Sequence, residues 1–161
     1  MSGLEWLEAL SYIVTIVGLP LAIGVYVHDR RREQQTDEEE IFLRLSDEYA
    51  DFMRLVIENA DLHLLSPTAK GALSEDQQER KHALFAILVA LFERAYVLVY
   101  EDDMSRQQAR LWQSWEDYMH EWCAREDFRA ALPPLLHGED SGFVATIERI
   151  AASAARDTTA G

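Results

Sequence analysis

The sequence has 161 residues, of which 48% are hydrophobic, and a formal net charge of −14. A chain of this length and apolar content holds one domain with a buried core, which excludes a protein that is disordered throughout. Its 29 acidic and 15 basic side chains disfavour nucleic-acid binding, because that binding depends on Lys and Arg displacing counterions from phosphates. The single cysteine, Cys123, cannot form an intramolecular disulfide, which excludes a disulfide-stabilised extracellular scaffold.

The first predicted element is a membrane-crossing helix over residues 9–27, after an N-terminal flank of residues 1–8. Residues 9–27 carry no charge, and as a helix they span about 28 Å, close to the hydrocarbon thickness of a bilayer. A cleaved signal peptide fits less well, because its basic residues precede the apolar run and residues 1–8 contain no Lys or Arg. A helix buried inside the protein stays open as an alternative.

An arginine collar, Arg30, Arg31 and Arg32, lies in the connector of residues 28–36 that follows this helix. Basic residues next to a membrane helix favour the cytoplasmic side. We therefore predict an N-terminus outside and a C-terminal domain in the cytoplasm. The expected location is a membrane, the bacterial inner membrane.

Small residues recur along the predicted membrane helix at steps of four, three and four. These residues are Ser11, Thr15, Gly18 and Ala22. Small side chains on one side of a membrane helix let two helix backbones approach closely. We therefore expect a homo-oligomer that associates through the membrane helix. Because small residues are common in such helices, a chance pattern is the alternative.

The rest of the chain predicts an acidic all-α domain over residues 37–155, followed by a disordered tail over residues 156–161. Its apolar residues recur with a period near 3.6, and no alternating pattern indicates a strand. We expect a bundle of three long helices plus short C-terminal helices. The first helix begins at a capping box of Thr36 and Glu39 and extends to Leu64.

A second helix is predicted over residues 74–100, opened by a capping box of Ser74 and Gln77. Its residues 83–92 are apolar on all sides, which is typical of a central helix buried in a bundle. Residues 83–100 also approach the length of a second membrane crossing. Two adjacent charges inside that stretch would cost about 2.5–3.5 kcal/mol each in lipid, so the buried helix is the favoured interpretation.

A third helix is predicted over residues 105–124. Its aromatic ridge consists of Trp112, Trp115, Tyr118 and Trp122. Packing against the central helix is the favoured interpretation of this ridge, and a groove for a partner helix or a lipid tail is the alternative. After a short helical piece, Pro133 and Pro134 are expected to break the chain, and Ser141 is expected to cap a last helix.

Catalytic motifs are missing from the sequence, which has neither a glycine-rich phosphate loop nor a nucleophile elbow. The one catalytic alternative worth weighing is a carboxylate–histidine metal site, because two acid–histidine pairs have the three-residue spacing of two-metal bundle proteins. These candidate ligands are Glu79, His82, Asp117 and His120. His120 lies about 200° around its helix from Tyr118, so a surface cluster is favoured over a metal centre. We expect no cofactor, no metal and no catalytic residue.

Residues 111–150, together with the N-terminal apolar segment, resemble a family of uncharacterised small bacterial membrane-anchored all-helical proteins. The similarity is carried by spaced aromatic residues: Trp112, Trp115, Tyr118, Phe128 and Phe143. The resemblance implies an architecture and no catalytic residues.

The function that these patterns favour is a non-enzymatic interaction or scaffold protein, anchored in the lipid bilayer by one helix. It would present its acidic domain to an unidentified protein partner, and it would not bind nucleic acid. Two alternatives stay open. One is an oligomeric pore or membrane-permeability effector, and the other is a metal-dependent enzyme that uses the carboxylate–histidine pairs.

Overall fold

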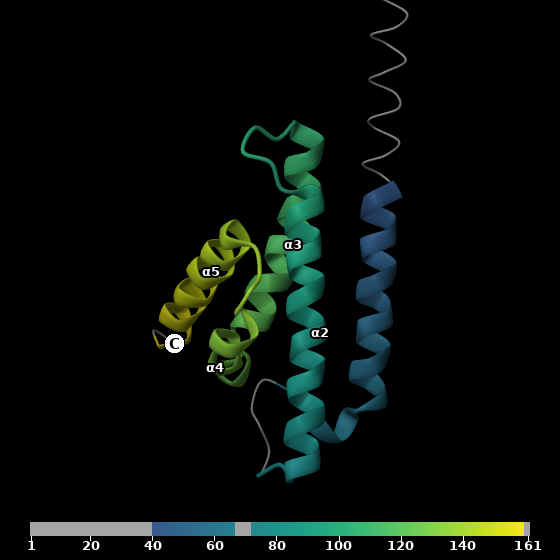
Figure 1. Ribbon diagram of the computed structural model, residues 1–161, viewed down its shortest axis with the longest axis vertical. Helices are drawn as coiled ribbons and strands as arrows, with labels where there is room; N and C mark the ends of the chain where they lie inside the picture. Colours follow the sequence, from purple (N-terminus) through teal and green to yellow (C-terminus); the bar gives the residue numbers. More distant parts are fainter. Residues whose placement is uncertain (1–39, 67–71, 160–161) are drawn as a thin grey trace, which may run out of the picture. The chain divides into compact units, whose positions relative to one another are not determined.

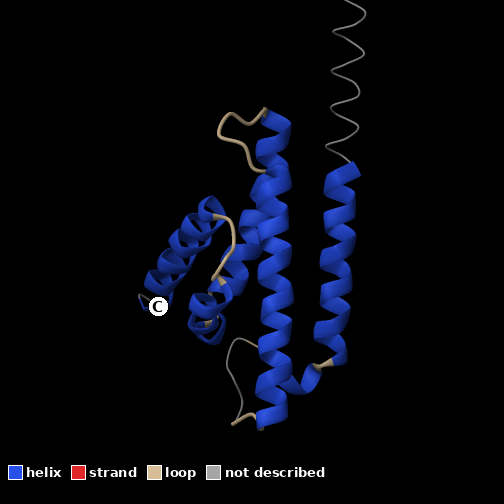
Figure 2. Ribbon diagram, in the orientation of Figure 1, coloured by secondary structure: helices blue, strands red, loops and turns tan. Residues whose placement is uncertain are grey.

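Helices make up every regular element in the part of the chain that the structure describes (Figure 2). The structure is a computed structural model that describes residues 40–66 and 72–159. In chain order the elements are helix 40–58, η1 (Ala60–Leu62), α2 (Glu75–Val99), α3 (Arg106–Cys123), α4 (Glu126–Leu135) and α5 (Ser141–Thr159) (Figure 1). The prediction of an all-α domain is confirmed for these residues.

The predicted membrane segment, residues 9–27, lies outside the described residues, as does the predicted start of the first helix at Thr36. The same holds for the residues proposed to associate in the membrane or to form the collar: Ser11, Thr15, Gly18, Ala22, Arg30, Arg31 and Arg32. These features remain predictions.

Helix 40–58 ends earlier than the predicted end at Leu64. Asn59 follows the helix, and its side-chain Nδ2 donates to the carbonyl of Leu55 at 2.9 Å. The chain then forms η1 and turns at His63, which has a φ of 52°. A residue in this left-handed conformation cannot continue a right-handed helix, so Leu64 reaches the core from a turn and not from a helix.

α2 is the central helix of the bundle, as predicted. It begins at the expected capping box, in which Ser74 Oγ accepts from the Gln77 N–H at 3.3 Å and Gln77 Oε1 accepts from the Ser74 N–H at 2.9 Å. It contacts α3, α4, α5 and η1. Helix 40–58 runs antiparallel beside it, and the ion pair between Glu48 and Arg94 joins the two (Figure 1).

The prediction that two prolines end the helix after α3 is wrong. Pro133 and Pro134 lie inside the last turn of α4, and the Leu136 N–H still donates to the carbonyl of Leu132 at 2.9 Å. Each proline removes one backbone donor. The loss is tolerated because both prolines lie on the exposed side of α4, while Phe128 and Leu132 anchor its other side in the core.

The last helix also differs from the prediction. Asp140, and not Ser141, caps it, because Asp140 Oδ1 accepts from the N–H groups of Gly142 at 2.9 Å and Phe143 at 3.0 Å. With 19 residues, α5 is not a short terminal helix. It extends to Thr159, beyond the predicted domain end at residue 155, and its buried side chains hold it on the bundle: Phe143, Ile147, Ile150 and Ala154.

A cluster of partly buried charges ties α2 to α4. Asp127 pairs with Lys81 at 2.6 Å and with Arg125 at 2.8 Å. Arg125 also donates to the carbonyls of Leu64 at 2.8 Å and Ser66 at 2.6 Å, which fixes the turn after η1. Burial opposes the ionisation of Asp127, but hydrogen bonds from Arg125 and Lys81 outweigh it and lower the pKa of this carboxyl.

Candidate interaction surface

The side of α2 opposite its core contacts is exposed and mostly apolar. Five residues at steps of four, three, four and three lie along it, and we call them the α2 stripe: Ala83, Ile87, Ala90, Arg94 and Val97. Ile87 is 46% exposed and Val97 is 59% exposed. Residues 83–92 belong to the central helix, as predicted, but Ala83, Ile87 and Ala90 are exposed. Their composition is apolar all round, but the other helices cover one side of them only.

A groove lies between the α2 stripe and helix 40–58. It holds a cavity of about 300 Å³, lined by Glu48, Ile87, Ala90, Leu91 and Arg94. Leu55 is partly exposed and lies two turns from Glu48 on the same side of helix 40–58, so it continues the apolar wall. Ala90 is the smallest side chain of the lining, and it leaves room for a backbone to approach the middle of the groove.

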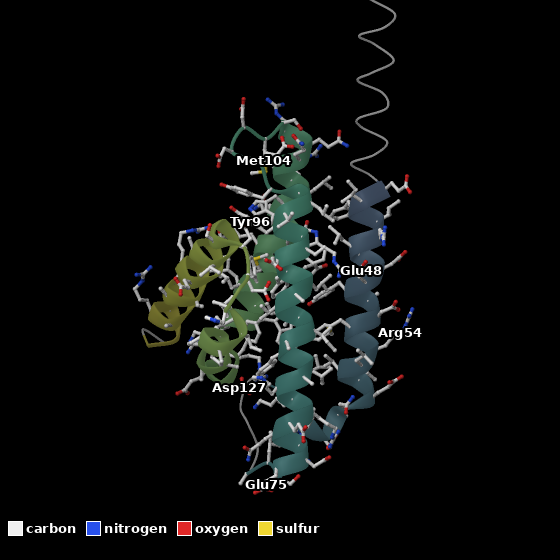
Figure 3. All side chains as sticks on the ribbon, viewed as in Figure 1. Glu48, Arg54, Glu75, Tyr96, Met104 and Asp127 are labelled. Carbon is white, nitrogen blue, oxygen red and sulfur yellow. The ribbon has the colours of Figure 1, made fainter. Side chains whose placement is uncertain are left out.

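The charges of the groove are paired across it. Glu48 lies on helix 40–58 beside α2 (Figure 3). Arg94 donates to Glu48 at 2.5 Å, and Arg44 approaches the same carboxylate at 3.7 Å. Two guanidinium groups thus approach one carboxylate, and the exposed carboxylates of Asp47 and Asp51 lie on the same helix. Arg94 is consequently the charged member of a stripe whose other members are apolar, and its charge is balanced from the neighbouring helix.

The N-terminal end of α2 is acidic and is held by a network on the surface. Arg80 pairs with Asp61 at 2.6 Å and with Asp76 at 3.1 Å. The hydrogen bond from Arg80, followed by that from Gln77, lowers the pKa of Asp61 to about 2. Glu79 and Glu58 lie exposed near this network and have no guanidinium of their own in the described ion pairs.

Sequence reasoning did not find the α2 stripe. The continuous apolar run of residues 83–92 conceals which side is exposed, because both sides are apolar. Ala83, Ile87 and Ala90 lie on the exposed side, and the buried side carries the larger residues: Leu84, Phe85, Leu88, Val89, Leu91 and Phe92. The signal that could have found it is the position of Arg94, which falls in register with Ile87 and Ala90 at the spacing of a coiled-coil seam.

The aromatic ridge of α3 lies mainly in the core. Trp112, Trp115 and Trp122 are buried, and Tyr118 is half-buried against Tyr49, with ring centroids 4.3 Å apart. The ridge contacts several other helices: Trp122 packs edge-on against Phe52, Phe85 and Phe128. Within the described residues these tryptophans therefore pack as the favoured interpretation expected.

One of the four ridge residues borders a second cavity. This cavity has a volume of about 230 Å³, and Trp122 closes it together with Tyr49, to whose hydroxyl the Trp122 Nε1–H donates at 3.2 Å. Its other lining residues are Met53, Leu64, Leu65, Ser66, Glu121, Ala124 and Arg125. The Arg125 guanidinium is already bound to backbone carbonyls and to Asp127, so it presents no unpaired charge to a ligand.

The four candidate metal ligands are not assembled into a site. Glu79 and His82 lie exposed on α2, Asp117 lies exposed on α3, and His120 is half-buried. Among residues 40–66 and 72–159, no three His, Cys, Asp or Glu side chains lie close enough to share a metal ion.

The single cysteine is a core residue. Cys123 is fully buried, and burial raises the pKa of its thiol to about 12. The thiol therefore stays protonated at neutral pH, and the reactive form of a cysteine, the thiolate, does not form.

No protein family model, curated protein or solved structure matches the chain. The resemblance to small bacterial membrane-anchored helical proteins accordingly remains a prediction.

Proposed function

We propose that this protein is a non-enzymatic interaction protein, which residues 9–27 anchor in a membrane and whose acidic helical domain binds a protein partner through the α2 stripe. The observation that carries the proposal is the exposed apolar side of α2. Monomeric proteins rarely leave a continuous apolar surface on a central helix, and such surfaces usually mark an interface.

The shape of the surface supports helix recognition. The members of the α2 stripe follow the spacing at which one helix packs on another, and the groove beside Glu48 supplies the second wall. We therefore assign the partner a helix with an apolar side.

Site-specific photo-crosslinking in cells tests this proposal. A photoreactive amino acid at position 87 of the full chain is expected to give discrete covalent adducts with protein. The same amino acid at Gln113, which is exposed on α3, is the matched control. If position 87 gives no more adduct than position 113, the α2 stripe is not an interface and the proposal fails.

The anchor is tested separately. The full chain is expected to remain in the membrane fraction after alkaline carbonate extraction, whereas the double variant Ile16→Lys, Val17→Lys is expected to be released. Each lysine near the middle of a membrane helix costs about 2.5–3.5 kcal/mol on insertion scales. Extraction of the unaltered chain would contradict the anchor and would leave the α2 interface standing.

A second candidate function is an oligomeric pore in which α2 also crosses the membrane. α2 is the one described helix that is long and apolar enough to do so, with a mean hydropathy of 1.8 over 18 residues. Of that window, 44% is buried inside the bundle. Reconstituted protein that carried ions across liposomes, and lost this flux when Ala90 was replaced by Glu, would favour the pore.

A further inference from the structure

The cavity beside Trp122 combines apolar walls with a few polar groups, which is the make-up of a small-molecule site. We propose that this cavity binds a small uncharged aromatic compound that carries one hydroxyl group, a molecule of the size of a simple phenol. The cavity shares no lining residue with the groove beside the α2 stripe. The inference therefore goes beyond the proposed function and does not depend on it.

The apolar walls of the cavity come from three parts of the chain. Met53 lies on helix 40–58, Leu64 and Leu65 lie in the turn after η1, and Trp122 and Ala124 lie at the end of α3. An apolar cavity of about 150 Å³ holds benzene, so a volume of about 230 Å³ suits one six-membered ring with one or two substituents. Burial of that ring among these side chains would supply most of the affinity.

The Tyr49 hydroxyl is a fixed hydrogen-bond donor at this cavity. The Tyr49 ring stacks on Tyr118 with centroids 4.3 Å apart, and its hydroxyl accepts from the Trp122 Nε1–H at 3.2 Å. Burial, and to a smaller extent the charge of Glu121, raises the pKa of Tyr49, so the hydroxyl keeps its proton at neutral pH. Tyr49 donates to no group in the part of the chain that the structure describes, which leaves this proton for a ligand.

The Glu121 carboxylate is the matching acceptor. Glu121 lines the cavity, is exposed, and forms no ion pair with any residue that the structure describes. It lies close enough to Tyr49 for its charge to affect the hydroxyl. An ionised carboxylate only accepts hydrogen bonds, whereas a hydroxyl both donates and accepts. A ligand hydroxyl therefore satisfies both residues, because it donates to Glu121 and accepts from Tyr49.

The charges of the lining favour an uncharged ligand. The lining contains one carboxylate, Glu121, and one guanidinium, Arg125, so its formal charges cancel. Arg125 donates to Asp127 at 3.1 and 2.8 Å and to the carbonyls of Leu64 and Ser66 at 2.8 and 2.6 Å. An anionic ligand would meet Glu121 without a free cation, and a cationic ligand would place its charge near Arg125. The same bonds from Arg125 hold the turn that forms one wall, which prepares the cavity for a ligand.

Methyl NMR of the full chain in lipid nanodiscs tests the inference with p-cresol as the probe. The chain has four methionines, of which Met53 lines the cavity, while Met104 lies in the loop between α2 and α3 and is the internal control. In protein labelled with ¹³C at the methionine methyl groups, p-cresol is expected to shift the Met53 signal in a saturable way, with a Kd below about 1 mM, and to leave the Met104 signal in place. The variant Met53→Leu assigns the signal. A Met53 signal that does not shift at millimolar p-cresol, or that shifts in proportion to Met104, overturns the site.

Three related compounds with the same ring test the class of ligand. Toluene lacks the hydroxyl, benzoate carries a negative charge, and benzylamine carries a positive charge. We expect toluene to bind about 3- to 10-fold more weakly than p-cresol, because it loses the hydrogen bonds of the hydroxyl, and we expect the two charged compounds to bind more weakly than p-cresol as well. Free concentrations are measured by dialysis, because toluene partitions into lipid. Toluene that binds as tightly as p-cresol, or benzylamine that binds more tightly, overturns the proposed class.

The variant Tyr49→Phe tests the hydrogen bond, because it keeps the ring and removes the hydroxyl. It is expected to weaken p-cresol binding by about 3- to 10-fold and to leave toluene binding within about two-fold. Tyr100→Phe removes a hydroxyl outside the cavity and is the matched control, with no expected change. Circular dichroism melting checks that both variants fold. An equal loss for p-cresol and toluene would assign the effect of Tyr49→Phe to altered packing and overturn the role given to the hydroxyl.

Discussion

The two sides of α2 are both mostly apolar and have different surroundings. On one side Phe92 and Leu88 are fully buried in the core. On the other side Ile87 and Val97 are about half exposed, and Ile87 lines the groove beside helix 40–58. The free energy falls when an apolar surface is buried. Tertiary packing, or a partner, decides which element buries it.

The largest expected effect comes from shortening one side chain on each side of α2 to alanine and comparing the free energies of unfolding. Phe92→Ala is expected to lower the free energy of unfolding by about 3–5 kcal/mol, because it leaves a cavity in a packed core. Ile87→Ala on the α2 stripe is expected to change it by at most about 0.5 kcal/mol in the isolated chain. Urea unfolding followed by tryptophan fluorescence measures both values. An equal loss for the two variants would mean that the α2 stripe is covered in the free protein.

The comparison of buried and exposed sites extends to the ion pairs of two neighbouring residues of α2, Lys81 and Arg80. Lys81 and Arg125 are 16% and 11% exposed and share Asp127. Asp127→Ala leaves both cations without their anion, and we expect a loss of about 1–3 kcal/mol in the free energy of unfolding.

The matched control is Asp76→Ala, which removes a partner of Arg80. The side chain of Asp76 is 79% exposed and its pair with Arg80 is screened by water. We expect a change of about 0–0.5 kcal/mol. A loss as large as that of Asp127→Ala would show that the N-terminal end of α2 is less solvated than its exposure indicates.

The smallest expected effect is the pH dependence of the Asp61 pair. Arg80 lowers the pKa of Asp61 from 3.8 to about 2, so the stabilisation is present above pH 4 and is lost as the pH falls from about 4 to about 2. Carboxyl-carbon NMR titration reports this pKa. Replacing Arg80→Gln is expected to raise the pKa of Asp61 towards 3.8, as is high salt. A pKa that stayed near 2 in the variant would assign the shift to another group.

Local signals in the sequence predicted the start of two helices correctly. In the predicted box, the side chains of Ser74 and Gln77 bond each other's backbone N–H groups within four residues, so no distant contact is needed to place this start. The box of Ser105 and Gln108, which was not among the predicted signals, does the same for α3. The same logic failed at Ser141, because Asp140 offers a competing acceptor one residue earlier. It also failed at Pro133, where core packing of α4 outweighs the loss of a backbone hydrogen bond.

The sequence by itself determined the class of the fold, the central position of α2 and the packing of the three α3 tryptophans. The spacing of apolar residues, the capping residues and the number of large apolar side chains are properties of single segments, so no tertiary contact is needed to read them. Tertiary structure alone decided which side of α2 is covered. It also decided that Glu48 balances Arg94 and that Asp127 joins Lys81 to Arg125. The pairs Glu48–Arg94 and Lys81–Asp127 connect residues far apart in the chain, and their formation depends on how helices pack, which no local pattern encodes.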